Sequence, residues 1–419
     1  MNTAWAQRRP SLPLCGCLFL AMAAGSGAVR AQTCPAPANN QLFNASLCVE
    51  GQVATVGANR LQAIIDAIDN EQLSNTFSGY NRDISGGQFR IDIRGLPVTL
   101  GYETNSTQLA FAVPSLGINE TFSGGTRDAS NDLFEDYIKQ NGDAILRELL
   151  RVSPVDPLAG NPASVQSQMV VGDYDAGVDA MYDTAAPGSA FSAGVRFGSF
   201  GLDRFTQNVY TLPLSYTYTF SNRDVLMVRL PLTYVEVEGA AAYRGMLGLS
   251  YKKVLSSRWA LTPSLGYGIA GSSDLGSLGH ILSASLTSDL QLYNNGKLSL
   301  SMGNLLGYYL TLPVRIGDYS VDYNLKNTIT RNGLLLSIPL QQRPWGRELS
   351  IDFFVTGTWF FGDALYTNNY QEIGFSIGPR RAADKRKPNL SSHPFGIGVK
   401  YTRGEADVSG FEVNFGYRF

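Results

Sequence analysis

The chain ends in Phe411-Glu412-Val413-Asn414-Phe415-Gly416-Tyr417-Arg418-Phe419, which alternates strictly between apolar residues and polar or glycine residues. A period of two residues predicts a β-strand rather than a helix. One side of this strand is aromatic and the other is polar or bare, which is typical of a strand between lipid and a wet lumen. A flat aromatic strand at the edge of a sheet promotes aggregation unless another strand pairs with it. We therefore expect this strand to close a β-barrel.

The composition also favours a barrel that crosses a membrane with strands. Charged residues make up 16% of the chain, against about 25% in typical soluble domains, whereas aromatic residues reach 11%. The part of the chain after the N-terminal segment contains no run of about 18 apolar residues, so we expect no spanning helix there. A net charge of -2 with two histidines predicts no nucleic-acid partner.

The N-terminus has the pattern of a secretory signal peptide. Arg8-Arg9 precede an apolar stretch from Leu12 to Ala24, and Val29-Arg30-Ala31 has the small-residue spacing of a cleavage site. We expect residues 1–31 to be removed after Ala31, and we do not interpret them as a spanning helix. Arg30 within the site leaves the cleaved bond uncertain by a few residues.

Export determines how the four cysteines are interpreted. Cys15 and Cys17 lie in the signal peptide, so the mature chain keeps Cys34 and Cys48. A close pair of cysteines in an oxidising compartment predicts a disulfide. The alternative is two free thiols, and a metal site would lack its other ligands.

Residues 32–127 are expected to form a small α+β module. Leu61, Ile64, Ile65 and Ile68 recur at helical spacing. A polar, turn-rich stretch then leads to short alternating segments separated by turn residues. These predicted strands are Phe89–Ile93, Val98–Leu100 and Leu109–Val113. About 95 residues are just enough to bury a core.

Residues 128–186 are predicted to be an amphipathic helix and a linker. Asp132, followed by Glu135 three residues later, has the pattern of an N-terminal cap, and Pro154 and Pro157 end the helix. Two positions are open for this helix: packed on the small module, or at or inside the mouth of the barrel as a pore plug. The segment from Val165 to Tyr182 is only weakly helical in pattern. The apolar residues of the candidate plug are Leu133, Phe134, Tyr137, Ile138, Ile145, Leu146 and Leu149.

Residues 187–419 contain about twelve alternating segments and are predicted to form an all-β, antiparallel transmembrane barrel. Most segments have roughly the nine to eleven residues that a tilted strand needs to cross the hydrocarbon layer. The segments before the terminal one are Phe191–Gly198, Tyr210–Phe220, Leu226–Tyr234, Tyr243–Tyr251, Leu261–Ile269, Leu282–Leu292, Leu298–Met302, Leu334–Leu340, Leu349–Phe361, Ile373–Ile377 and Phe395–Tyr401.

The turns support an even number of strands. Tight turns follow the second, fourth and sixth segments, and short turns are typical of the periplasmic side. A further candidate strand, Tyr319–Thr330, is assigned to an outer loop or hairpin between the seventh and eighth strands. The basic run Arg380–Lys387 becomes a long periplasmic turn in this register. If that run is outside instead, fourteen strands are expected.

The order of a signal peptide, a small N-terminal region, an amphipathic helix and a barrel ending in Phe resembles the autotransporter β-barrel class. It is most similar to the solitary, autotransporter-like barrels, over roughly residues 131–419. The resemblance implies an outer-membrane protein that contacts outer-membrane lipid and the barrel-assembly machinery, and we expect a monomer. It departs from the class because no long β-helical passenger precedes the helix. The resemblance also implies that the assembly signal consists of Phe411, Val413, Phe415, Tyr417 and Phe419.

Catalysis, a cofactor and a metal are not expected. The chain has two histidines, His280 and His393. His280 and Ser283 are three residues apart in a predicted strand, so their side chains point to opposite faces. The charges on the inner side of the barrel are mixed in sign and are expected to pair across the lumen or to contact a plug. They are Arg196, Arg229, Arg244, Lys252, Asp352, Glu372, Lys400, Glu412 and Arg418.

Three classes of function are compatible with the sequence. The first is an autotransporter-like barrel that translocates or anchors its own small N-terminal domain. The second is a porin-like channel with a periplasmic N-terminal module. The third is a non-conducting structural or adhesive surface barrel. The surface accessibility of residues 32–127 separates the first from the second, and single-channel conductance separates the second from the third.

A charged residue in place of Phe419, or deletion of Phe419, should strongly lower insertion of the barrel, because the terminal strand carries the assembly signal. The measurement is the amount of folded barrel in the outer-membrane fraction. The same charged residue at Asn414, on the polar side of the strand, is the control. Equal losses at the two positions would mean that the terminal Phe has no special role.

Overall fold

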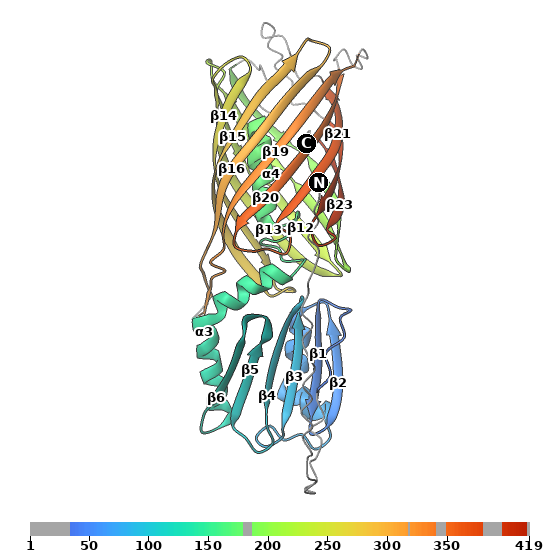
Figure 1. Cartoon of the computed structure of the whole chain (residues 1–419), viewed down its shortest axis with the longest axis vertical. Helices are drawn as coiled ribbons and strands as arrows, with labels where there is room; N and C mark the ends of the chain where they lie inside the picture. The colour runs from blue at the N-terminus through green and yellow to red at the C-terminus, as the bar shows by residue number, and fades with distance from the viewer. Residues whose placement is uncertain (1–33, 179–186, 317–318, 341–348, 380–395, 417–419) are drawn as a thin grey trace, which may run out of the picture. The chain divides into compact units, whose positions relative to one another are not determined.

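The computed structural model describes residues 34–178, 187–316, 319–340, 349–379 and 396–416. The predicted signal peptide, Tyr417, Arg418, Phe419, His393 and the run Arg380–Lys387 lie outside the described residues. Residues Cys34–Phe419 form one compact unit that contains a small sheet and a barrel (Figure 1).

The N-terminal module is a six-stranded antiparallel sheet with two short helices. The strands follow the order β2-β1-β3-β4-β5-β6. The sequence predicted three of these strands and the first helix. The elements are β1 (Phe43–Val49), β2 (Gln52–Ala58), α1 (Leu61–Ala67), α2 (Asn70–Thr76), β3 (Gly87–Ile93), β4 (Leu96–Tyr102), β5 (Gln108–Val113) and β6 (Ile118–Ser123). A short 3-10 helix, η1 (Pro114–Leu116), precedes β6.

A disulfide holds the first described residue of the module to β1, the second strand of its sheet. Cys34 is bonded to Cys48 of β1, and the Cα atoms are 5.7 Å apart. The Arg90 side chain of β3 also donates a hydrogen bond to the carbonyl of Cys34 at 2.9 Å. The segment before β1 is thereby tied to two neighbouring strands.

The long amphipathic helix α3 (Arg127–Val152) packs on the module, not inside the barrel. It begins five residues before the predicted cap, because Thr126 accepts a hydrogen bond from the Ala129 amide at 3.2 Å. Phe134 and Tyr137 lie 5.1 and 5.4 Å, between ring centroids, from Phe111 and Phe122 respectively. The plug hypothesis for this helix is therefore wrong. Of the proposed plug residues, Phe134, Tyr137, Ile138, Ile145 and Leu149 pack with the module, Leu146 packs near the barrel mouth, and Leu133 is exposed.

The barrel is a closed antiparallel sheet. It contains fifteen strand segments, and three pairs of these (β7/β8, β9/β10, β11/β12) are successive halves of single strands, so twelve strands form the wall. The segments are β7 (Gly188–Ala193), β8 (Val195–Leu202), β9 (Phe205–Leu212), β10 (Leu214–Thr219), β11 (Val225–Arg229), β12 (Leu232–Val237), β13 (Ala240–Val254), β14 (Trp259–Ser272), β15 (Ser277–Asn294), β16 (Ser299–Leu312), β19 (Lys326–Pro339), β20 (Leu349–Gly362), β21 (Asn369–Pro379), β22 (Ile397–Gly404) and β23 (Ser409–Phe415).

The predicted twelve strands and their order are confirmed. The terminal strand β23 pairs with β8, from Ser409 opposite Gly201 to Phe415 opposite Val195, and so closes the barrel. One assignment was wrong in part. Residues 326–330 belong to β19, so only the hairpin of β17 (Val314–Ile316) and β18 (Tyr319–Val321) lies between the seventh and eighth strands.

The two ends of the barrel differ. At one end, which we call the module end, the Leu61 amide donates a hydrogen bond to the Asp274 carbonyl at 2.8 Å, between the module and the turn after β14. At the other, which we call the terminal end, β7 begins, β23 ends, and short turns follow β10, β13 and β15. The sequence that leads into the barrel thus enters its wall at the end far from the module.

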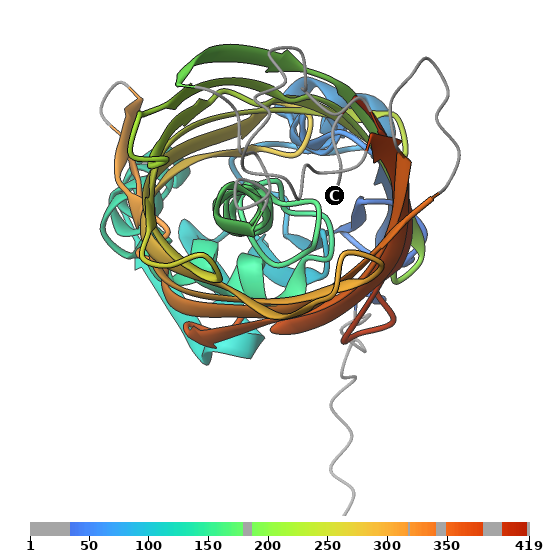
Figure 2. The ribbon, with the colours of Figure 1, turned by 90° about the horizontal axis from the view of Figure 1, so that it is seen from above.

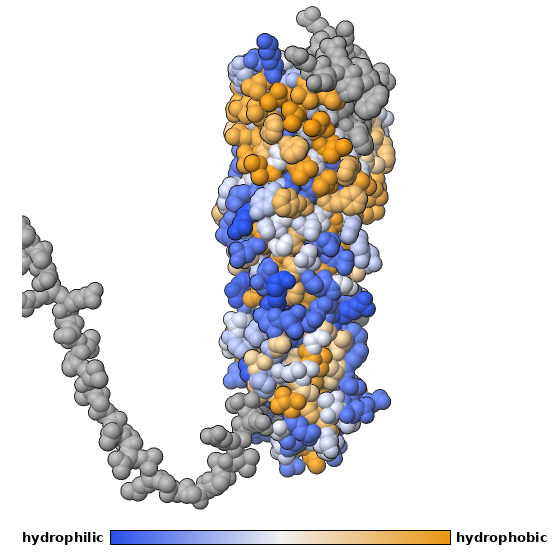
Figure 3. Space-filling model, turned by 90° about the vertical axis from the view of Figure 1, so that its right-hand side faces the viewer, coloured by the Kyte–Doolittle hydropathy of each residue, from blue (hydrophilic) through white to orange (hydrophobic). Residues whose placement is uncertain are grey.

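The outer face carries a belt of exposed apolar side chains such as Phe197, Leu247 and Phe375. On the face seen in Figure 3, this belt covers the part of the barrel toward the terminal end, and more hydrophilic residues lie toward the module. A closed barrel with such a belt has the architecture of outer-membrane β-barrels. Among the residues that the structure describes, no helix is both long and apolar enough to cross a membrane.

The inner face is polar but filled, which differs from the wet lumen expected of the terminal strand. Glu412 and Asn414 of β23 are both buried. A second helix accounts for this burial, as described below.

Serine at both Cys34 and Cys48 should lower the free energy of unfolding of the module by roughly 3 kcal/mol, because the bond closes a loop of about 15 residues. The measurement is proteolysis of the module in the full-length protein at increasing urea. Wild-type protein treated with reductant is the control and should match the double variant. Unchanged resistance in both would show that the disulfide does not stabilise the module.

Candidate functional site

The lumen of the barrel contains the helix α4 (Val165–Val178). Viewed from above, α4 lies inside the ring of strands (Figure 2). Nearly all of its residues are buried, both apolar ones such as Met169 and Val170 and polar ones such as Gln166 and Asp173. The sequence indicated only a weakly helical linker here. A helix surrounded by protein on every side has no solvent-facing stripe, so its apolar residues show little helical period.

Two glycines allow α4 to approach the wall closely. A Cβ atom at Gly172 would lie 2.5 Å from the Arg229 guanidinium, and one at Gly177 would lie 2.3 Å from the Thr287 side chain. Both distances are shorter than any normal contact. A side chain at Gly177 would therefore push the helix away from β15, whereas one at Gly172 would force the end of the Arg229 side chain to move.

Asp173 is the principal polar anchor of α4. Its carboxylate accepts hydrogen bonds from Arg229 at 2.6 Å, from the Ser285 hydroxyl at 3.0 Å and from the Tyr309 hydroxyl at 3.1 Å. These partners belong to β11, β15 and β16. Loss of the carboxylate would leave the largely buried Arg229 guanidinium without its counter-ion, which costs about 3–5 kcal/mol for a buried pair.

Both ends of α4 are also bonded to the wall. Near the first turn, Gln166 donates to the Asn327 side chain at 3.0 Å. At the last turn, the Lys252 ammonium donates to the Gly177 carbonyl at 2.6 Å and lies 3.5 Å from Asp289. A cation at the C-terminal end of a helix is favourable because the carbonyls there carry partial negative charge.

The wall beside α4 carries a buried network of alternating charges. Glu372 contacts Arg331 and lies 2.6 Å from the Lys400 ammonium, which in turn contacts Glu412. The Arg331 guanidinium also lies 5.1 Å from the centre of the Tyr174 ring of α4. Several of the predicted inner charges, namely Arg229, Lys252, Glu372, Lys400 and Glu412, thus pair across the lumen or with a helix inside it, as the sequence predicted, and that helix is α4.

Little open space remains between α4 and this network. A cavity of about 30 Å³ lies among residues that include Tyr174, Asp289, Arg331 and Lys400. Such a cavity holds only one or two water molecules, by the volume that a buried water requires.

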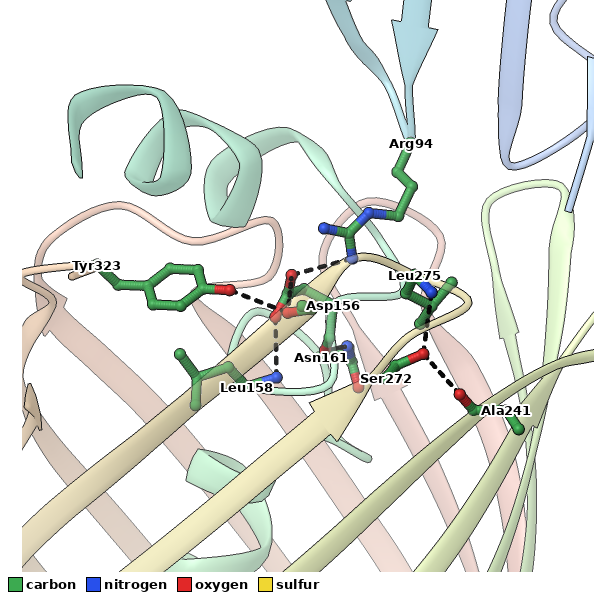
Figure 4. Close-up of polar contacts among 9 residues, drawn as sticks. Arg94, Asp156, Leu158, Asn161, Ala241, Ser272, Leu275 and Tyr323 are labelled. Atoms are coloured by element: carbon green, nitrogen blue, oxygen red, sulfur yellow. Dashed lines mark hydrogen bonds and ion pairs between the residues drawn. The ribbon is translucent and has the colours of Figure 1, made fainter. Parts of the chain in front are cut away.

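At the module end, a buried ion pair joins the module to the segment that enters the barrel (Figure 4). Arg94 lies at the tip of the β3–β4 hairpin, where Arg94 and Gly95 have positive φ angles of 53° and 98°. Its guanidinium donates to the Asp156 carboxylate at 3.0 Å, and both side chains are fully buried. Asp156 also accepts from the Leu158 amide at 2.8 Å and from the Ser277 hydroxyl at 3.3 Å.

Tyr323 completes the polar cluster at the mouth. Its hydroxyl lies 3.0 Å from the Ser277 hydroxyl. Burial raises the pKa of Tyr323, so the phenol stays neutral beside the Asp156 carboxylate.

An apolar cluster surrounds these polar contacts and joins the module to the inner wall of the mouth. In the module it contains Phe43, Leu47 and Phe77, with Ile64 of α1. In the barrel it contains residues from the module ends of several strands and turns. These barrel residues are Phe200, Leu202, Phe205, Val209, Val235, Val237, Leu275 and Val408.

The sequence missed Asp156 and Asp173 as functional residues. A signal for Asp173 was present, because an acid lies beside the apolar run Met169–Val171 while arginines face inward on the predicted strands. Arg94 and Asp156 are 62 residues apart, and no local pattern connects a hairpin tip with a residue between two prolines.

The structure brings no catalytic group together around His280. That residue lies on the outer face of β15, where its ring nitrogens lie 2.6 Å from the Tyr267 hydroxyl and 3.2 Å from the Pro313 carbonyl. Ser283 points into the barrel and is buried, so the two residues face opposite sides, as expected. Within the described ranges, no group of three or more His, Cys, Asp or Glu side chains could hold a metal ion.

Comparison with solved structures finds outer-membrane barrels. The β-domain of the Bordetella autotransporter BrkA matches with a TM-score of 0.41 and 14% identity, over 55% of this chain and 99% of its own. The translocator domain of the autotransporter NalP from Neisseria meningitidis matches with a TM-score of 0.39 and 12% identity, over 61% of this chain and 96% of its own.

Porins are also among the matches. The NanC porin has a TM-score of 0.34 and 9% identity, over 54% of this chain and 100% of its own. No protein-family model and no curated protein sequence matches the chain. The barrel is thus similar to those of autotransporter translocator domains and of porins alike.

Proposed function

We propose that this protein is an autotransporter-like outer-membrane barrel that anchors its own N-terminal module at the cell surface. The observation that carries the proposal is the path of the chain through the lumen. The segment 153–164 is buried at the module end, α4 continues through the barrel, and β7 begins at the terminal end. A polypeptide threaded in this way has its N-terminal module on one side of the membrane and the end of its last strand on the other.

The outer surface of the barrel supports the orientation of the module. Outward residues near the module end are polar, whereas further along the same strands they become apolar. On β19, for example, Thr328 and Asn332 are exposed, and the exposed apolar Leu334 follows them toward the terminal end. The polar outward residues at the module end include Ser199, Thr206, Glu236, Gln371 and Arg403.

A barrel wall that continues past its apolar belt projects into water on that side. Outer-membrane barrels have short turns on the periplasmic side and extend further outside. The belt here lies near the terminal end, where β23 finishes, and the projecting wall carries the module. Both features favour a periplasmic terminal end and an external module.

The closed mouth favours an anchor over an open channel. α4, the Arg94–Asp156 pair and the apolar cluster occupy the path that a solute would take. The proposal includes insertion by the outer-membrane assembly machinery and a monomeric barrel in outer-membrane lipid. The alternatives are a porin-like channel and a purely adhesive barrel. The experiments below distinguish these alternatives from the proposed anchor.

An epitope inserted at Gly79 should be reached by antibody on intact cells, and the same epitope inserted at Gly296 should not. Gly79 lies in an exposed turn of the module and Gly296 in the turn after β15 at the terminal end. Both glycines have positive φ angles, and a Cβ atom at either position would have no neighbouring atom within 4 Å, so the two insertions are structurally matched. Permeabilising the outer membrane should expose the epitope at Gly296. The opposite labelling would place the module in the periplasm.

Alanine at Asp173 should convert a closed barrel into one with frequent open events in planar-bilayer recordings, because the main anchor of α4 is lost. Alanine at Asp136 is the control, since that carboxylate is largely exposed on α3 and pairs only at the surface with Lys139. The Asp136 variant should stay as closed as the wild type. A large steady conductance in the wild type itself would support the channel alternative instead.

A further inference from the structure

The outer wall of the barrel contains an apolar groove of about 870 Å³. It crosses six neighbouring strands, β8, β9, β12, β13, β14 and β15, at the border of the apolar belt nearest the module end. It lies on the outer face, because most of its lining residues, such as Phe197, Tyr234 and Ile269, are exposed there. Inward-facing residues such as Thr211 and Arg244 lie between them in the same strands. The outward apolar residues of the groove are Val195, Phe197, Tyr210, Leu212, Leu232, Tyr234, Tyr243 and Ile269, all of which are exposed.

Aromatic rings form the edge of the groove toward the module. Phe197 and Tyr210 lie 6.0 Å apart, Tyr210 and Tyr234 lie 6.0 Å apart, and Tyr234 and Tyr243 lie 5.5 Å apart, between ring centroids. In the strand register this row continues to Gly271, where no side chain is present. Tyrosine rings are typical of the membrane–water interface.

Aliphatic residues form the next row along the strands. Leu212 lies opposite Leu232, Leu232 opposite Gly245, and Gly245 opposite Ile269. Gly245 and Gly271 are thus bare positions in adjacent rows of neighbouring strands. Gly245 leaves the backbone uncovered along the floor of the groove, whereas the Leu278 side chain lies 3.2 Å from where a Cβ at Gly271 would be.

The wall itself does not require a glycine at position 245. A Cβ atom there would lie 3.7 Å from Leu232 and 3.8 Å from Ile269, which are ordinary contact distances, and the backbone has no positive φ. The absent side chain therefore serves no packing need that the structure shows. Its effect is to keep the groove open.

The chemistry of the groove restricts its occupant. The groove lies inside the belt that faces hydrocarbon. Among the outward-facing residues of its lining, hydrogen-bonding side chains lie only at the tyrosine edge and at Ser273, which follows β14 at the module end. An extended peptide in this place would leave its backbone groups unpaired, which hydrocarbon does not tolerate. A saturated hydrocarbon chain has no polar group to satisfy.

We propose that this groove is a binding site for an acyl chain of a membrane lipid, whose head group lies past the tyrosine row toward the module end. The chain would lie over Gly245 and Gly271, between Leu232 and Ile269. The head group would meet the polar outward residues that follow the rings, such as Asn208 and Glu236. The lipid site requires only that the barrel lies in a bilayer. The proposal of this site can therefore be wrong or right whether the module lies outside the cell or in the periplasm.

The test is native mass spectrometry of the full-length barrel, purified in detergent and titrated with phosphatidylethanolamine. The wild type should retain about one lipid per barrel. Leucine at Gly245 should weaken that binding at least tenfold, because it fills the floor and each displaced methylene contact is worth about fourfold. Leucine at Gly201 is the matched control, since Gly201 also faces outward, has only Ser409 atoms nearby at 3.8 Å, and lies outside the groove.

Alanine at Tyr243 is a second variant that does not depend on filling the floor. The ring is largely exposed, so its removal should leave the fold intact while weakening lipid retention severalfold. Equal retention by the wild type and the Gly245 variant would overturn the proposal, as would a wild type that retains no lipid. A wild-type dimer that the Gly245 substitution dissociates would assign the groove to a second copy of the chain and would also overturn it.

Discussion

The structure depends on one constraint, which is that hydrocarbon tolerates no unpaired backbone N–H or C=O group. Twelve strands satisfy it only by closing, and the pairing of β23 with β8 completes the ring. The prolines in the wall test this constraint, because Pro213 and Pro231 have no N–H to donate. Next to them the Gly194 amide donates to the Pro213 carbonyl at 3.2 Å, and the Leu230 amide donates to the Leu214 carbonyl at 2.8 Å. The regular ladder of backbone hydrogen bonds is therefore interrupted at these prolines, but the neighbouring strands stay bonded to each other.

Closure of the barrel also encloses a lumen that must be filled. About eight strands enclose a space that side chains can fill, and twelve enclose more. The inner wall is polar, so the filling must both occupy the space and supply partners for the charges. α4 does this through Asp173, while Glu372 and Lys400 satisfy each other. Among the residues that the structure describes, the buried Arg244 guanidinium has no hydrogen-bond partner, and the carboxylate of Asp156 is bonded to Arg94 instead. A buried polar group without a partner costs free energy, so the filling of the lumen does not satisfy every inward charge.

The parts of the fold that were predictable from the sequence are those with a strong local period. Each wall strand contacts lipid on one side and the lumen on the other, so alternation such as Tyr216, Tyr218 and Phe220 against Thr217 and Thr219 identifies it. The pattern weakens where inward and outward residues are alike. β16 was predicted to end at Met302 but runs to Leu312. The prediction stopped too early because Gly303, Leu305 and Tyr309 face inward, where polar residues were expected. For α4 no local period exists, since its environment is protein on all sides.

The exchanged roles of the two helices follow from the same reasoning. The apolar stripe of α3 needs a dry partner along its whole length, and a lumen lined by Glu372, Lys400 and Arg229 cannot provide one. The module can, because β4, β5 and β6 present Leu96, Val98, Phe111 and Phe122 on one face. α4 has few charged residues and no one-sided apolar stripe. It can therefore be buried on all sides without a large cost in free energy, provided that the Asp173 carboxylate pairs with a cation, here Arg229. The segment with the clearer helical pattern was therefore the wrong candidate for the lumen: a strong amphipathic period indicates a surface with one wet side, and a filled barrel has none.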